Sequence, residues 1–231
     1  MSDVPRQQKP ISAPVIRRKI KVLVTWIGFI EYAKAYNNLQ GIKSVKDQLE
    51  YMLNSYQPVL LTLQETMLTD KSSRCRLQGY TCVEVKHKIK KGGRGLLTAV
   101  RNTAGLTISE YRSNPYWMAT KVSGTLTSNN KIEMMVINVH IPSSSTKKKQ
   151  VTEQIATFAR NYKLKHPGHI ILVMGDFNMK TDAAVKYTTK IGVGLQRAKT
   201  MNSPGSRVVN GKIGNMIDHI MYSGITHRPL G

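Results

Sequence analysis

Apolar runs of strand length recur along the chain, and each ends in turn residues or in a polar or charged residue. They occupy residues 58–65, 94–101, 169–176 and 215–223. Their length and their continuous apolar character are typical of buried β-strands. Two further segments, 116–126 and 131–142, flank the turn sequence TSNNK, and this pattern predicts a β-hairpin.

Segments of helical periodicity lie between these runs. One face of a helix over residues 43–54 is formed by Val45, Leu49, Met52 and Leu53. A second amphipathic helix is marked by Val151, Ile155, Phe158 and Ala159. A third helical segment is expected over residues 180–190. Strands that interleave with helices, together with a hairpin, predict an α/β fold with mixed sheets.

The 231 residues are enough for one sizeable core, and no repeat or low-complexity linker divides them. We expect residues 1–19 to be a disordered basic lead-in and residues 20–231 to form one domain. The longest apolar run, 22–30, falls far short of the roughly 20 residues that span a bilayer. Two cysteines, Cys75 and Cys82, are too few for a disulfide framework or a zinc site, which favours a reduced intracellular compartment.

The charge of the chain predicts a polyanionic partner. It has 35 Lys and Arg against 13 Asp and Glu, a formal net charge of +22. Nucleic acid is the natural partner, an anionic membrane is the rival, and a merely solvated basic surface is the third alternative. Basic residues cluster at 16–21, 86–94 and 146–150, and each cluster is dense enough to contact phosphates.

Three of the few acids, Glu65, Asp176 and Asp218, stand at or near the ends of strongly apolar strands. A single acid in such a place most often caps a turn. Burial of a carboxylate without a partner is costly, so three of them together indicate convergence on a shared cation or proton.

Five ordered motifs carry a family resemblance. They are LQET (63–66), GGRGLLTAVRN (92–102), NVHIP (138–142), GDFN (175–178) and MIDHI (216–220). Together they resemble the endonuclease/exonuclease/phosphatase superfamily, and most of all the apurinic-endonuclease-like domain of LINE-type (non-LTR) retrotransposons. The resemblance implies a DNase I-like fold, a four-layer α/β sandwich of two mixed β-sheets flanked by helices. Its active site lies where strand ends of both sheets meet.

The resemblance also implies roles for individual residues. Glu65 and Asn38 would hold Mg²⁺, or Mn²⁺ in its place, because a hard cation prefers oxygen ligands. Asp176 would orient or deprotonate the attacking water, and Asn178 would donate hydrogen bonds to a phosphate oxygen and the nucleophile. His140 would contact the scissile phosphate.

Two motifs of the family are imperfect here. The first motif fits Asn38, although one inserted residue would make Asn37 the match. In the family, the aspartate that corresponds to Asp218 orients a closing histidine, and only His227 is placed to be one. His219 should point to the opposite face of its strand. Either His227 serves through a shortened loop, or the domain lacks its last strand and its activity is impaired; we expect the second.

The sequence thus predicts a Mg²⁺-dependent, retrotransposon-derived endonuclease domain that nicks DNA. The alternatives are an impaired nucleic-acid-binding remnant and a phosphatase or phosphodiesterase of the same superfamily. Nucleic-acid contacts are expected from Lys88, Lys90, Lys91 and Arg94. We expect an intracellular, nuclear monomer without a membrane partner or a small-molecule cofactor.

Overall fold

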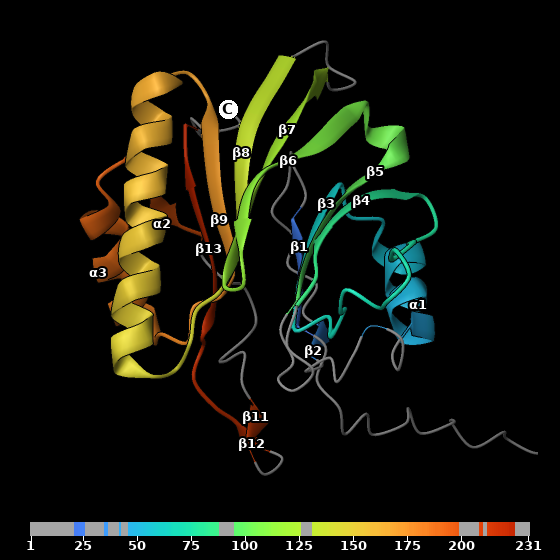
Figure 1. Cartoon of the computed structure of the whole chain (residues 1–231), viewed down its shortest axis with the longest axis horizontal. Helices are drawn as coiled ribbons and strands as arrows, with labels where there is room; N and C mark the ends of the chain where they lie inside the picture. The colour runs from blue at the N-terminus through green and yellow to red at the C-terminus, as the bar shows by residue number, and fades with distance from the viewer. Residues whose placement is uncertain are drawn as a thin grey trace, which may run out of the picture.

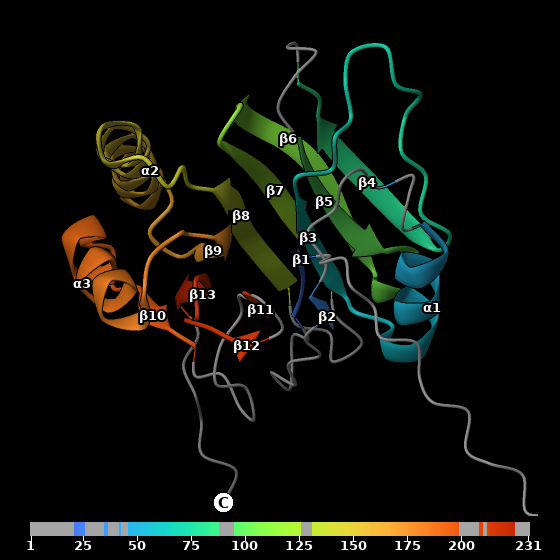
Figure 2. The same cartoon turned by 90° about the horizontal axis from the view of Figure 1, so that it is seen from below.

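Two β-sheets pack face to face and are enclosed by helices (Figure 1). The computed structural model of the chain describes residues 21–25, 35–36, 42, 46–87, 95–125, 131–198, 208–209 and 212–224. Figure 2 shows the layers edge-on, with α1 outside one sheet and α2 and α3 outside the other. The helices are α1 (Lys46–Tyr56), α2 (Ser145–Lys165) and α3 (Thr181–Ile191). The expected four-layer α/β sandwich is confirmed.

The first sheet has five strands among the described residues, in the order β2-β1-β3-β5-β4. Their bounds are Lys21–Thr25 (β1), Ala35–Tyr36 (β2), Leu60–Gln64 (β3), Tyr80–Val85 (β4) and Leu96–Arg101 (β5). Neighbouring strands run antiparallel throughout this order. A 3₁₀ turn, Asn102–Ala104, follows β5 and leads to the second sheet.

The second sheet has six strands among the described residues, in the order β10-β13-β9-β8-β7-β6. Their bounds are Leu106–Asn114 (β6), Trp117–Thr125 (β7), Lys131–His140 (β8), Ile170–Asp176 (β9), Gln196–Arg197 (β10) and Asp218–Ser223 (β13). Strands β8 and β9 run parallel, which makes this sheet mixed. A short separate pair is formed by β11 (Val208–Val209) and β12 (Lys212–Ile213).

Three hydrophobic clusters hold the layers together. One fills the space between α1 and the first sheet, where Leu49 packs with Leu61 and Leu97. The second lies between α2, α3 and the six-stranded sheet, and the third lies between the two sheets. The central strands are therefore buried on both faces, which is why they appear in the sequence as continuous apolar runs.

Most of the expected elements are confirmed with shifted bounds. The hairpin is β7–β8, and the expected last strand, 215–223, begins later, at Asp218. Strands β4 and β6 were not predicted, because each is at a sheet edge and half-exposed and so lacks a continuous apolar run. The expected lead-in, 1–19, lies outside the described residues. Within the described part of the chain, every helix is too short or too polar to cross a membrane.

Candidate active site

The polar ends of three strands meet at one edge of the six-stranded sheet, the edge formed by the C-terminal ends of β8 and β9 and the N-terminal end of β13. Because β8 and β9 are parallel, their C-terminal ends lie side by side, and His140 is the register partner of Asp176. Strand β13 runs antiparallel to β9, so its first residue, Asp218, lies opposite Asp176. The strand directions alone thus gather one imidazole and two carboxylates, from distant parts of the chain, at one place.

The other sheet is fixed to this edge by buried hydrogen bonds. Nε2 of Gln64, the last residue of β3, donates to Oδ1 of Asn138 in β8 at 2.8 Å. Nδ2 of Asn138 donates to the carbonyl oxygens of Leu63 (3.1 Å) and Leu97 (2.9 Å). Asn138 is fully buried and Gln64 is 1% exposed. These bonds hold the end of β3, and with it Glu65, against the end of β8.

A glycine allows the two sheets to approach this closely. Gly175 has a φ of +137°, and a Cβ built there would lie 2.2 Å from the carbonyl oxygen of Val139 and 3.1 Å from Nε2 of Gln64. Any side chain would push β9 away from β8 or displace the Gln64 amide. The glycine of the GDFN motif therefore serves the packing that brings Asp176 and Glu65 together.

His140 lies between two carboxylates. Its Nε2 is 3.2 Å from Oε1 of Glu65 and 3.8 Å from Oδ2 of Asp176. The side chains of these three residues are 12%, 23% and 6% exposed, in the order His140, Glu65, Asp176. Acidic and imidazole groups are thus held together in a mostly buried but accessible cluster.

Asn178 holds the carboxylate of Asp176 in place. Its backbone N–H donates to Oδ1 of Asp176 at 2.8 Å, and its Nδ2 lies 2.7 Å from the carbonyl oxygen of Ile141 and 3.3 Å from Oδ2 of Asp176. These contacts favour a role for Asn178 in orienting Asp176. Its expected hydrogen bond to a phosphate oxygen stays a prediction.

Two residues of the cluster have left-handed backbone conformations. Asn178 has a φ of +47° and Glu65 a φ of +56°. Such conformations are unfavourable for residues other than glycine, and they persist where surrounding contacts impose them. For Asn178 one such contact is the Nζ of Lys148 in α2, which donates to its carbonyl oxygen at 2.7 Å.

Both ring nitrogens of His219 make hydrogen bonds to protein groups beside the site. Nε of Arg197 donates to its Nδ1 at 3.0 Å, so the neutral ring carries its proton on Nε2, which contacts the carbonyl oxygen of Met179 at 2.8 Å. The ring also packs edge-on against Phe177, with centroids 5.6 Å apart. His219 therefore supports the loop that follows GDFN.

The predicted site residues divide into two groups. Glu65, His140, Asp176 and Asn178 contact one another, and Asp218 lies on the adjacent strand at the same end. The others lie outside the described residues: Asn37, Asn38, His227, Lys88, Lys90, Lys91 and Arg94. No role was predicted for Gln64 or Asn138, and Lys148 was expected only as a member of the basic cluster 146–150. For the first two a signal existed, since an amide inside an otherwise apolar strand needs a buried partner.

The carboxylates fit a hard divalent cation better than a soft one. In the described part of the chain, no group of three or more His, Cys, Asp or Glu side chains could enclose a metal ion. Mg²⁺ does not need such a cage, because it binds through one or two carboxylates and keeps several waters. The carboxylate of Glu65, at the edge of this cluster, fits that mode. Soft thiolate ligands are not part of this cluster, because Cys75 and Cys82 both lie in or against the hydrophobic cluster between α1 and the first sheet.

Cations gather at the same edge. The predicted basic cluster 146–150 forms the first turns of α2, where Lys147 places its Nζ 5.6 Å from the centre of the Tyr116 ring. Lysines are unfavourable at the positive N-terminal end of a helix, and that end attracts anions. The arrangement therefore favours an anionic group near this edge.

Comparison with known proteins identifies the family. The profile of the Endonuclease/Exonuclease/phosphatase family matches residues 38–231. No curated protein matches the sequence significantly. The catalytic domain of Xenopus laevis APE2 is similar in structure, with a TM-score of 0.61, 17% identity and coverage of 80% of each chain.

Two further solved structures have the same fold. The AP endonuclease LMAP from Leishmania major has a TM-score of 0.63 and 14% identity, over 89% of this chain and 79% of that one. TDP2 from D. rerio, solved with a single-strand DNA product, has a TM-score of 0.53 and 14% identity, over 80% of this chain and 78% of that one. At such identities the likeness shows the fold, whereas the family profile spans most of the sequence. The chain belongs to the Endonuclease/Exonuclease/phosphatase family.

Proposed function

We propose that this chain is a Mg²⁺-dependent endonuclease that hydrolyses a phosphodiester bond and nicks DNA. The observation that carries the proposal is the convergence of Glu65, His140 and Asp176, with Nε2 of His140 3.2 Å and 3.8 Å from the two carboxylates. The net charge of +22 supports a polyanionic substrate. The AP endonuclease and the DNA-bound TDP2 among the structural neighbours support DNA in particular.

The roles that we propose combine the contacts of the described residues with the family resemblance. Asp176 accepts a proton from the attacking water, and the N–H of Asn178 holds its carboxylate in one orientation. His140, at the end of β8, contacts a phosphoryl oxygen. Glu65 and Asn38 would hold Mg²⁺, which when bound supplies electrostatic stabilisation of the charge that develops on the phosphoryl oxygens.

Supercoiled plasmid tests this proposal directly. With Mg²⁺ the chain should convert supercoiled to open circular plasmid, and with EDTA it should not. Plasmid that is bound but never nicked would contradict the proposal and favour an impaired binding remnant. Release of phosphate from lipid vesicles without nicking would instead favour a phosphatase of the same family.

The metal assignment has its own test. Glu65→Gln removes the charge of the proposed ligand, so half-maximal nicking should require a higher Mg²⁺ concentration. Glu133→Gln is a matched control, because Glu133 pairs with Lys121 on the surface far along β8. A Mg²⁺ titration of Glu65→Gln that coincides with that of Glu133→Gln would remove Glu65 from the metal site.

The role of His227 can be decided by a mutant cycle. If His227 acts with Asp218, then His227→Ala and Asp218→Ala should slow nicking equally, and the double variant should be no slower, because residues that act as one unit are non-additive. If His227 has no such role, His227→Ala should leave the rate unchanged.

We also propose a LINE-type origin and action in the nucleus. The five ordered motifs and the basic charge support these proposals. A reverse-transcriptase reading frame beside the coding sequence and a nuclear signal from a fluorescent fusion are the expected findings. A cytoplasmic signal and flanking genes of another kind would contradict them.

A further inference from the structure

A large groove runs between the edge strand β6 and the outer face of α2. Its volume is about 990 Å³, and it is lined by the end of β6 with Trp117 on one side and by α2 from Thr146 to Lys165 on the other. That stretch of helix is about 28 Å long at about 1.5 Å per residue. The groove is thus at the upper end of ligand-site volumes and is elongated.

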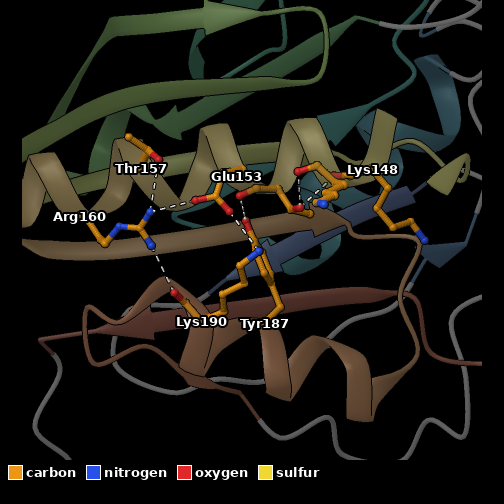
Figure 3. A network of polar contacts seen from close by, with 8 residues as sticks. Lys148, Glu153, Thr157, Arg160, Tyr187 and Lys190 are labelled. Atoms are coloured by element: carbon orange, nitrogen blue, oxygen red, sulfur yellow. Dashed lines mark hydrogen bonds and ion pairs between the residues drawn. The ribbon is translucent and has the colours of Figure 1, made fainter. Parts of the chain in front are cut away.

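The groove is lined by cations whose charge is not balanced within it. Arg112, Lys149 and Lys165 are exposed along it. Glu153 is the one acid among the residues that line it, and it pairs with Lys190 at 3.0 Å and Arg160 at 3.1 Å, on the side of α2 that faces α3 (Figure 3). The net positive lining therefore suits an elongated anion.

Aromatic rings line the same groove. Tyr111 is 50% exposed, and its ring packs edge-on against Phe158 and Tyr162, with centroids 5.9 Å and 5.6 Å apart. Trp117 is 2% exposed, and its Nε1–H has no acceptor among the described residues. The guanidinium of Arg112 lies 6.0 Å from the centre of the Trp117 ring. The groove thus combines one exposed aromatic ring, that of Tyr111, with a cation that lies beside a buried one.

A β-bulge places these side chains. The register of β6 on β7 shifts between Glu110 and Arg112, so Tyr111 has no partner residue in β7. A bulge bends an edge strand and re-aims its side chains. Here Tyr111 and the next residue, Arg112, both line the groove, although regular alternation would send them to opposite faces.

The groove begins beside the catalytic edge. The carbonyl oxygen of Tyr116, in the turn between β6 and β7, accepts a hydrogen bond from the N–H of His140 at 2.8 Å. Lys149 in the groove follows directly on Lys148, which contacts Asn178. A strand that leaves the catalytic cluster can therefore continue into the groove.

We propose that the groove between β6 and α2 binds an unpaired stretch of nucleic acid that is continuous with the strand in the catalytic site. A cationic groove with an exposed aromatic ring is the chemistry that holds single strands, because an unpaired base can stack on the Tyr111 ring while the cations follow the phosphates. The inference rests on the proposed function for the nature of the polymer. Its test, however, is a binding measurement that requires no hydrolysis.

The test is fluorescence anisotropy of a labelled oligothymidylate with the whole chain in EDTA. Tyr111→Leu keeps an apolar side chain against Phe158 but removes the stacking face, and it should weaken binding about fivefold or more. Tyr56→Leu is the control, since Tyr56 is 53% exposed on α1. Thermal melts of both variants show whether the fold is retained.

Charge is tested in the same assay by its salt dependence. In the double variant Lys149→Gln/Lys165→Gln, the slope of log K against log salt should fall in magnitude by about 1.4, because each phosphate contact on a single strand contributes about 0.7. Lys186→Gln, on the exposed face of α3, should leave the slope nearly unchanged. Photo-crosslinking of a bromouridine-substituted strand should label the peptide that contains Tyr111 or Trp117.

Several outcomes would overturn the inference. Groove variants that bind the oligonucleotide as tightly as the controls would place the single strand elsewhere. Binding of poly-glutamate in preference to the oligonucleotide would assign the groove to an acidic peptide. If the unmodified chain does not nick plasmid but the groove variants bind the oligonucleotide more weakly than it does, only the proposed function is refuted. If the unmodified chain nicks plasmid but the groove variants bind the oligonucleotide as tightly as it does, only the groove proposal is refuted.

Discussion

At the proposed catalytic edge, where β3 and β8 end, Gln64 and Asn138 join the two sheets and are at most 1% exposed. On the outer surface, Glu153 joins α2 to α3 through Lys190, and these two side chains are 49% and 54% exposed (Figure 3). Both networks link elements that are distant in sequence. The two networks differ in what happens when a contact is lost: water can solvate Glu153, but it cannot reach Asn138.

Buried contacts of the first kind fix how the sheets are placed, whereas exposed contacts of the second kind add little to the placement of the helices. A buried amide whose partner is removed keeps its full desolvation penalty, about 1–3 kcal/mol for each group. An exposed ion pair is solvated and screened. The proposed catalytic cluster depends on the first kind of contact, because Asn138 and Gln64 bring Glu65 to His140.

The largest effect is expected at the catalytic edge itself. Asp176→Asn should lower the nicking rate by about 10²–10⁴-fold, because the amide cannot act as a general base. DNA binding should remain within a few-fold, since the substitution removes a negative charge near the phosphate. Plasmid nicking and a filter-binding assay would measure both quantities.

The control for this variant is Asp182→Asn, an exposed aspartate in the first turn of α3. It should nick at the rate of the unmodified chain. If Asp176→Asn retained activity within a few-fold of Asp182→Asn, Asp176 would have no catalytic role.

The next largest effect is expected from the buried amide network that joins the two sheets. Asn138→Ala leaves the Gln64 amide and the carbonyl oxygens of Leu63 and Leu97 without their partner, and it should lower the free energy of unfolding by about 3 kcal/mol or more. Asn54→Ala, at an exposed position of α1, should change it by less than about 0.5 kcal/mol. Equal unfolding curves in urea for the two variants would show that the sheets do not depend on this network.

The sequence allowed prediction of the strands more readily than of the contacts between them. Strands β3, β8 and β9 are buried on both faces, so their continuous apolar runs were visible. The contact between Gln64 and Asn138 spans 74 positions and depends on how the sheets pack. The pattern of apolar and polar residues within each strand does not show which residues of the two sheets will face each other.

The site itself divides in the same way. Glu65, His140 and Asp176 were predicted as site residues because ordered motifs marked them, and their side chains do lie together. Lys148 was seen only as part of a basic cluster, since its contact with Asn178 requires α2 to pack beside the end of β9. The bulge at Tyr111 was likewise hidden, because β6 is an exposed edge strand with weak apolar alternation.

A contact of intermediate burial should have an intermediate effect. Lys148→Met keeps the aliphatic stem but removes the donor to Asn178, so the GDFN turn should be less well held. We expect kcat to fall about tenfold with little change in melting temperature, because small displacements of reacting groups in an active site strongly lower the reaction rate. Lys148→Arg should restore most of the rate.

The control for Lys148 is Lys186→Met, which removes an exposed lysine from α3. If KM rises equally in both lysine variants while kcat is unchanged, Lys148 acts only through net charge. A loss in kcat that Lys148→Arg does not repair would mean that the packing of the stem, and not its donor, is the important feature.

The smallest effect is expected in the outer network. Hydrogen bonds from Lys190 and then Arg160 lower the pKa of Glu153, so Glu153 stabilises the fold above its unfolded pKa, and this contribution disappears as the pH falls through the folded pKa. Glu153→Gln should lower the melting temperature by no more than about 2 °C at pH 7. The difference should shrink as the pH falls below the ordinary pKa of a glutamate, about 4.3, and it should also shrink in about 1 M salt. A larger or pH-independent loss in differential scanning calorimetry would mean that the exposed network holds α3 in place, as the buried one holds the sheets.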